Sequence, residues 1–164
     1  MNKKILIAAD DRSILESLSK LLRMEGYEVE LAEDGQKAVE KLIEGRVDLL
    51  LLDLGLPLKD GWVTLSWLDQ VNLLSPVIII TGRNNQRELA EKAGADALME
   101  KPLDVPLLLQ TIRELIDEPV ERRVRRAAQR PSGFRYVSCD RERFRVLQNE
   151  RFTLPLHGPD LKDV

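Results

Sequence analysis

The chain has 164 residues with a formal net charge of -3 at pH 7, and its 43% hydrophobic content is typical of a soluble globular domain with a real core. No segment approaches the roughly 20 apolar residues of a membrane span, and the apolar start is too short for a signal peptide, so we expect a cytoplasmic protein. One cysteine, Cys139, excludes an internal disulfide, and one histidine, His157, leaves a Cys/His zinc site with too few ligands.

The first 45 residues predict two strands, each followed by a helix. Residues 4–9 (KILIAA) favour a strand, and residues 12–26 place apolar side chains on one helical face before a glycine ends the helix. Residues 27–32 (YEVELA) alternate like a strand with one wetter face. Residues 34–45 predict a second helix, between an aspartate and a glycine.

The middle of the chain contains two strands with long apolar runs. Residues 47–53 (VDLLLLD) have four consecutive leucines before Asp53, which indicates a strand buried on both faces, as in a parallel sheet covered by helices. A loop then leads into a third helix, at about residues 62–74. Residues 76–81 (PVIIIT) predict a second buried strand.

A polar helix at residues 84–94 and a short strand at residues 96–100 come next. After Lys101-Pro102, residues 104–118 predict the last helix of this part, with Pro106 tolerated in its first turn. Five strands, each followed by a helix, predict an α/β doubly wound domain.

Charge divides the chain near residue 118. Residues 119–164 hold eleven Lys/Arg against six Asp/Glu, a balance of +5, which leaves -8 for residues 1–118. We therefore expect one domain at 1–118 and a short basic extension at 119–164.

The extension itself leaves several interpretations open. Residues 121–130 predict a basic continuation of the last helix, and FRYVSC (134–139) and RFRVLQ (143–148) predict two strands around a turn. The segment is short for an output domain, so a solvated, partly ordered tail, a protein-interaction or dimerisation segment and a nucleic-acid contact all remain alternatives. Its positive charge also suggests the hypothesis that it folds back on the acidic domain.

Polar side chains follow all five predicted strands, but those after the second, Glu33 and Asp34, stay out of any cluster if that strand lies at the outer edge of the sheet. The first strand ends in Asp10 and Asp11, the third in Asp53, the fourth in Thr81 and the fifth in Lys101. Because the carboxyl ends of parallel strands lie along one edge of an open sheet, we expect these groups to converge there.

Such a cluster suits phosphoryl chemistry. Hard carboxylate oxygens are ligands for Mg²⁺, and a lysine can pair with a phosphoryl oxygen while a threonine hydroxyl donates to another. A carboxylate can itself act as a nucleophile and form an acyl phosphate. The arrangement predicts an aspartate phosphorylation site at Asp53.

Four segments resemble the motifs of the response regulator receiver domain of two-component signalling. The resemblance extends over about residues 3–118, some 70% of the chain. The segments, in the order and spacing of that family, are ILIAADD, LLLLDLGLPLKDGW, VIIITG and GADALMEKPL.

The resemblance implies a flavodoxin-like fold, a five-stranded parallel sheet of order 2-1-3-4-5. It also implies that Asp53 receives a phosphoryl group from the phosphohistidine of a sensor histidine kinase. The implied Mg²⁺ ligands are Asp10, Asp11, Asp53 and the Gly55 carbonyl. Thr81 matches the family's switch hydroxyl, Lys101 matches its phosphate-pairing lysine, and Lys101-Pro102 matches a peptide that is usually cis.

Three positions depart from the usual family pattern. Leu98 stands where an aromatic switch residue is most common, which bears on the threonine-to-aromatic relay but not on phosphorylation. Gly55, two residues after Asp53, offers no side chain over the phosphoryl group, and Arg83, two after Thr81, is a long cation. Positions of this kind tune dephosphorylation in the family, so we expect an unusual phosphoryl lifetime.

Three functions compete on the sequence alone. The leading one is a phosphorylatable signalling module rather than an enzyme. A haloacid dehalogenase-type phosphatase also uses an aspartate nucleophile, but generally has an acid two residues on, where this chain has Gly55. A pseudo-receiver that binds partners without phosphorylation is the third.

The expected partners are a sensor histidine kinase and an unknown downstream protein. The resemblance also implies a homodimer through the fourth helix, fifth strand and fifth helix. We expect no nucleic-acid or membrane partner.

Overall fold

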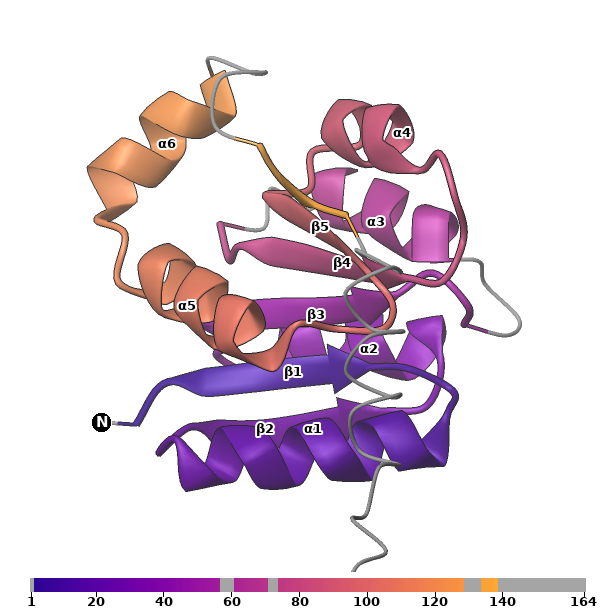
Figure 1. The fold of residues 1–164 in the computed structure, drawn as a ribbon. Helices are drawn as coiled ribbons and strands as arrows, with labels where there is room; N and C mark the ends of the chain where they lie inside the picture. Colours follow the sequence, from indigo (N-terminus) through magenta and orange to yellow (C-terminus); the bar gives the residue numbers. More distant parts are fainter. Residues whose placement is uncertain (1, 57–60, 71–73, 129–133, 139–164) are drawn as a thin grey trace, which may run out of the picture.

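The computed structural model describes residues 2–56, 61–70, 74–128 and 134–138. These residues form one parallel sheet with helices on both faces, and the carboxyl ends of the strands point to the right in Figure 1. The strand order is β2-β1-β3-β4-β5-β6. The strands are β1 (Lys4–Ala8), β2 (Glu28–Ala32), β3 (Leu49–Asp53), β4 (Val77–Thr81), β5 (Ala97–Glu100) and β6 (Arg135–Val137). The helices are α1 (Arg12–Met24), α2 (Gly35–Glu44), α3 (Gly61–Gln70), α4 (Arg87–Lys92), α5 (Val105–Ile116) and α6 (Val120–Ala128).

The predicted doubly wound α/β fold and its strand order 2-1-3-4-5 are confirmed, but the sheet has six strands rather than five. The sixth, β6, comes from the extension and lies within the first of its two predicted strands. The second, at 143–148, lies outside the described residues.

The prediction that the extension continues the last helix was wrong, because α5 ends at Ile116 and α6 begins at Val120 as a separate helix. Pro119 lies between them; it has no N–H to donate, and its ring disfavours helical backbone at the residue before it. The chain therefore changes direction, and Figure 1 shows α6 next to the end of α5.

Buried apolar side chains form two layers, one on each face of the sheet. Strands β3 and β4 are buried along their whole length, as their unbroken apolar sequences predict. Buried side chains of α2, α3 and α4 pack on one face of the sheet, and those of α1 and α5 pack on the other. Burial on both faces fixes where the central strands end, and so fixes the positions of the polar residues that follow them.

The extension folds back on this domain through both α6 and β6. Arg123 of α6 donates hydrogen bonds to the carbonyls of Leu74, Leu115 and Glu118, at 3.0, 3.3 and 3.2 Å. Leu115 lies in the last turn of α5, Glu118 lies in the connection after it, and Leu74 precedes β4, so α6 is tied to two parts of the domain. No helix in the described part of the chain is long and apolar enough to cross a membrane.

Candidate functional site

Asp53 is the last residue of β3, and its carboxylate is buried at the carboxyl edge of the sheet, with 4% of the residue exposed. Its Oδ1 accepts a hydrogen bond from the Gly55 N–H at 2.9 Å, and its Oδ2 lies 2.5 Å from Lys101 Nζ. A buried carboxylate needs such partners, because removal from water disfavours its charge. Both oxygens are therefore oriented before any ligand arrives.

Lys101 reaches Asp53 from the end of β5, across the intervening strand β4. Its backbone N–H donates to the Thr81 carbonyl at 2.8 Å, which fixes the backbone position from which the lysine side chain extends. The lysine side chain is 26% exposed, so its ammonium group lies between the buried carboxylate and solvent. The Lys101-Pro102 peptide is cis, as the resemblance implied.

Thr81 ends β4, one residue beyond the register partner of Asp53, and is almost fully buried. Its Oγ1 accepts a hydrogen bond from the Arg83 N–H at 3.0 Å. A hydroxyl that accepts in this way keeps its own proton to donate to another oxygen. The convergence predicted for Asp53, Thr81 and Lys101 thus agrees with their positions at the ends of three successive strands of the sheet.

Asp10 and Asp11 follow β1, which pairs directly with β3, and both are exposed. Asp11 is the N-cap of α1: its Oδ1 accepts hydrogen bonds from the N–H groups of Ser13 and Ile14, at 2.8 and 3.3 Å. Over the described residues, no three acidic, histidine or cysteine side chains form a group that could hold a metal. The carboxylate donors have the chemistry that Mg²⁺ prefers, and the predicted ligand set stays a prediction.

Two glycines control the space around Asp53. A Cβ at position 55 would lie 3.3 Å from Asp53 Oδ1, so any side chain there would crowd the carboxylate. A Cβ at position 61 would lie 2.9 Å from both Cα and Cδ2 of Leu54, closer than real side chains approach. Gly61 is therefore required by packing, whereas Gly55 leaves the approach to Asp53 open.

The other two departures from the family pattern have different surroundings. Arg83 is exposed in the segment after Thr81. Leu98 is completely buried in β5, between Ile79 of β4 and Tyr136 of β6. The sequence predicted the strand that contains Tyr136, but it did not predict that this strand pairs with β5 or that Tyr136 has a role there.

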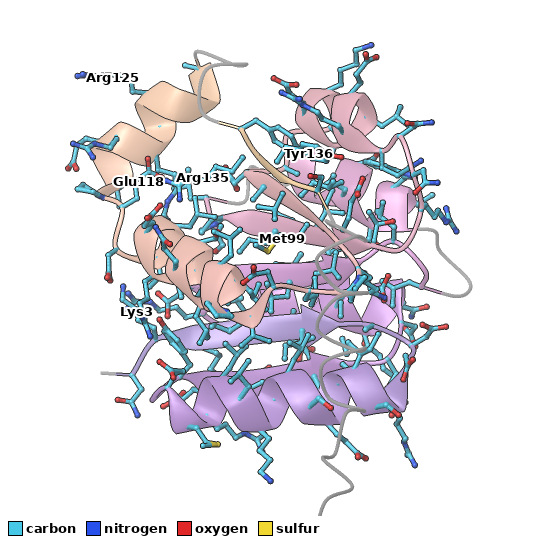
Figure 2. All side chains as sticks on the ribbon, viewed as in Figure 1. Lys3, Met99, Glu118, Arg125, Arg135 and Tyr136 are labelled. Carbon is cyan, nitrogen blue, oxygen red and sulfur yellow. The ribbon has the colours of Figure 1, made fainter. Side chains whose placement is uncertain are left out.

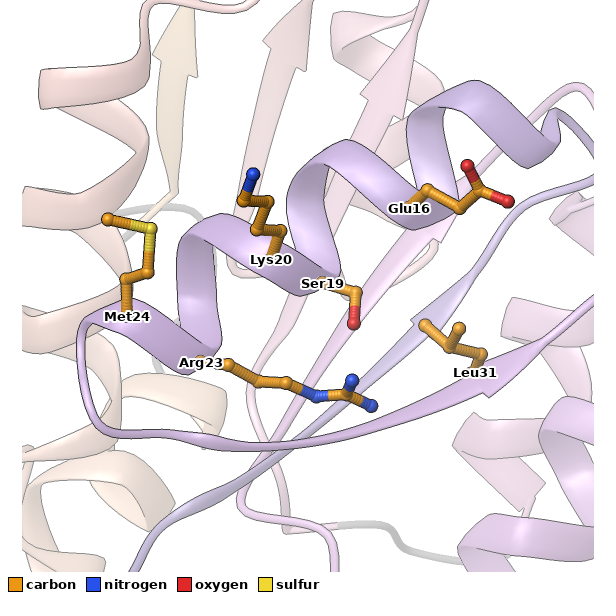
Figure 3. Close-up of a pocket in the computed structure, with 6 residues that line it drawn as sticks. All are labelled: Glu16, Ser19, Lys20, Arg23, Met24 and Leu31. Carbon is orange, nitrogen blue, oxygen red and sulfur yellow. The ribbon is translucent and has the colours of Figure 1, made fainter.

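Two hollows lie along α1. One, of about 330 Å³, borders the site between the start of α1 and the β5–α5 connection, and is lined by Ser13, Ile14, Ser17, Leu18, Lys101, Pro102 and Leu103. The other, of about 490 Å³, lies between α1 and β2 (Figure 3), and is lined by Glu16, Ser19, Lys20, Arg23, Met24 and Leu31. Only the first contains a residue of the cluster, namely Lys101.

The family model described as the response regulator receiver domain matches residues 5–113. Transcriptional regulatory protein CpxR of Escherichia coli K12 is 40% identical over 115 residues, which cover 69% of this chain and 49% of CpxR. Response regulator MprA of Mycobacterium leprae is 32% identical over 167 residues, covering 88% of this chain and 71% of MprA. The chain spans about half the length of CpxR and of several other MprA proteins.

Solved structures agree with this match. A CheY-like receiver domain protein from Methanospirillum hungatei superposes with a TM-score of 0.69 at 34% identity, over 74% of this chain and 98% of that one. Response regulator TrrA from Thermotoga maritima, solved in complex with Mg²⁺-BeF, has a TM-score of 0.64 at 30% identity, over 69% of this chain and 98% of that one.

Proposed function

The chain belongs to the response regulator receiver family, and from this premise we propose that Asp53 accepts a phosphoryl group from the phosphohistidine of a sensor histidine kinase. The observation that carries the proposal is the buried Asp53 carboxylate, oriented by the Gly55 N–H and paired with Lys101 at 2.5 Å. A nucleophile fixed in this way loses little freedom on reaction. Two-component signal transduction is thus the function to which the site is suited, with Asp53 as its acceptor.

In the proposed transfer, a carboxylate oxygen of Asp53 attacks the phosphorus atom. The new P–O bond forms as the P–N bond to the kinase histidine breaks, and the electron pair of that bond leaves with the imidazole. Lys101 Nζ offsets the negative charge that the phosphoryl group brings, and the Thr81 hydroxyl donates to a phosphoryl oxygen. Mg²⁺, when bound, neutralises charge on the phosphoryl oxygens.

We assign the Mg²⁺ ligands to Asp10, Asp11, Asp53 and the Gly55 carbonyl. The assignment is supported by the donor chemistry and by the adjacency of β1 and β3. It requires Asp11 to share its carboxylate between the metal and the N-cap of α1. We also assign residues 1–118 to the receiver domain and residues 119–164 to an extension of it.

We assign the 330 Å³ hollow beside Lys101 as a place where the kinase docks. It is lined by the first turns of α1 and by Pro102 and Leu103, so a partner seated there would lie next to Asp53. A mostly apolar hollow next to the reacting group would position the donor phosphohistidine.

A cytoplasmic location fits a histidine kinase as the phosphoryl donor. The expectation that the chain has no nucleic-acid partner stays a prediction, and the name of one relative, a transcriptional regulatory protein, points the other way.

The test is modification of the full chain by acetyl phosphate with Mg²⁺, followed by intact-protein mass spectrometry. Wild type is expected to gain the mass of one phosphoryl group, and Asp53→Asn is expected to gain none. Asp34→Asn is the matched control: Asp34, like Asp53, lies at the carboxyl end of a strand and accepts a backbone hydrogen bond, in its case from the Lys37 N–H as the N-cap of α2, and asparagine keeps that acceptor. This control is expected to react like wild type.

The same experiment separates the competing functions. Continuous turnover of phosphoesters by wild type would support a phosphatase instead. Inertness of wild type toward acetyl phosphate and beryllium fluoride, with Mg²⁺ present, would support a pseudo-receiver. Modification that persists in Asp53→Asn would place the acceptor elsewhere.

A further inference from the structure

The extension adds a parallel strand to the free edge of β5. The register places Arg135 beside Ala97, Tyr136 beside Leu98 and Val137 beside Met99, and the Arg135 N–H donates to the Asp96 carbonyl at 3.1 Å. Figure 2 shows Arg135 and Tyr136 along this edge, next to the strand that carries Met99. An edge strand presents unpaired N–H and C=O groups, and β6 satisfies part of that row.

The domain to which β6 attaches is complete without it. The family match ends at residue 113, before both α6 and β6. The Methanospirillum structure is covered over 98% of its length by 74% of this chain, so a receiver of this fold exists as a unit without the whole extension. The segment 134–137 is therefore in the position of a ligand bound to a finished domain.

Side chains of the segment alternate between the two faces of the sheet, as the period of a strand requires. Phe134 packs against the apolar cluster that includes α4, and Val137 packs against the cluster that includes α5. The segment thus makes apolar contacts on both faces of the sheet.

Three polar contacts add selectivity to these apolar ones. The Tyr136 hydroxyl donates to Glu100 Oε1 at 2.8 Å, and the Arg87 guanidinium lies 5.1 Å from the centre of the Tyr136 ring. Arg135 forms an ion pair with Glu114 of α5. The contacts come from α4, β5 and α5, one from each element that borders the segment.

We propose that the edge of β5 is a docking site for an extended peptide of the pattern aromatic–Arg–Tyr–aliphatic, and that residues 134–137 are its resident, reversibly bound ligand. Strand addition supplies affinity through the backbone, and the alternate side chains supply specificity. Reversibility follows from size and exposure: β6 has three residues where β3 has five, and Tyr136 remains 37% exposed. The proposal does not depend on phosphorylation of Asp53.

Occupancy of this edge also bears on self-association. The resemblance implied a homodimer through the fourth helix, fifth strand and fifth helix, which are α4, β5 and α5. In this structure the edge of β5 is already paired, and Arg87 and Glu114 are already in contact with β6. A second copy that used the β5 edge would first have to displace residues 134–137.

The first test measures backbone hydrogen exchange in the full chain and in Tyr136→Ala. This variant alters the ligand and leaves the docking site intact. Loss of one hydrogen bond and one cation–π contact is expected to raise the undocked fraction about tenfold, with faster exchange of the β6 amides and of the β5 amides that face β6 by the same factor. The amides of β1 and β3 serve as the internal control for an intact domain.

The second test adds a synthetic peptide of residues 132–138 (SGFRYVS) to full-length Tyr136→Ala. The peptide is expected to bind and to restore slow exchange in β5, whereas the same peptide with alanine in place of tyrosine is expected to bind at least about tenfold more weakly. Arg87→Ala in the same background is expected to weaken binding of the intact peptide. Unchanged β5 exchange in Tyr136→Ala, or failure of the intact peptide to bind, would overturn the proposal.

Discussion

The ion pair of Lys101 with Asp53 at the carboxyl edge of the sheet and that of Arg135 with Glu114 at the β5 edge differ in burial. Lys101 and Asp53 join two strands across a third, with Asp53 almost fully buried. Arg135 and Glu114 join β6 to α5, with side chains 41% and 44% exposed. Removing the cation from a buried carboxylate leaves a charge that water cannot reach, whereas water takes the place of a lost partner at an exposed carboxylate at little cost in free energy. The first region is therefore built to hold a charge in place, and the second to open.

The largest expected effect comes from the packing that fixes the central strands. Leu51 is fully buried in β3, so Leu51→Ala is expected to lower the free energy of unfolding by about 3 kcal/mol. Val137→Ala is the matched edge variant, from a half-buried position in β6, and is expected to lower it by less than about 1 kcal/mol. Urea denaturation of both variants measures the contrast, and equal losses would mean that β6 is part of the core.

A smaller effect is expected from the buried ion pair. Lys101→Met leaves the Asp53 carboxylate without its cation, and is expected to cost about 2 kcal/mol, less than a fully buried pair because Lys101 is partly exposed. In Lys101→Met/Asp53→Asn the unpaired charge is gone, so part of this loss is expected to return. Urea denaturation of wild type, Lys101→Met, Asp53→Asn and the double variant measures the coupling free energy between Lys101 and Asp53.

Arg135→Met is the surface control for that cycle. Its partner Glu114 is exposed, so the stability of the whole domain is expected to change within the error of the measurement. A loss as large as that of Lys101→Met would contradict the contrast between the two pairs.

The smallest effect concerns alkaline pH at the β5 edge. The hydrogen bond to Glu100 raises the pKa of Tyr136, and partial burial of the ring adds to this shift to a smaller extent. A raised pKa in the docked state means that the tyrosine stabilises docking below its unfolded pKa of about 10, and that this contribution is lost as pH rises through the docked pKa. Docking of β6 is therefore expected to weaken above about pH 10.

Ultraviolet titration of tyrosinate in Tyr27→Phe measures this effect, because the chain has only two tyrosines. Tyr27 must be removed, since burial also raises its pKa. Glu100→Gln in the same background is the control and is expected to lower the pKa of Tyr136. Titration of Tyr136 at the same pH in folded and denatured protein would show that the bond to Glu100 is not formed in solution.

Much of the central region could be predicted because its signals are local. The unbroken apolar run before Asp53 indicates a two-sided strand, and parallel topology then brings strand ends together without knowledge of any contact. Asp11 shows the limit: an aspartate before a helix is both a good N-cap and a good metal ligand, and the sequence does not say which role it takes. The pairing of β6 depends on contacts between residues far apart in the chain, so FRYVSC indicated a strand but not its neighbour.

Because β6 belongs to the same chain as the edge that it covers, dilution does not release it. A ligand joined to its site by a short connection is present at an effective concentration in the millimolar range, whatever the amount of protein in the cell. Arg123, which holds α6 against the end of α5 and the Leu74 carbonyl, keeps the start of that connection close to the sheet. A competing chain must therefore bind the β5 edge with much higher affinity than residues 134–137 do, or must first detach α6. The anchoring of Arg123 in α6 thus sets an affinity threshold for every partner of the β5 edge.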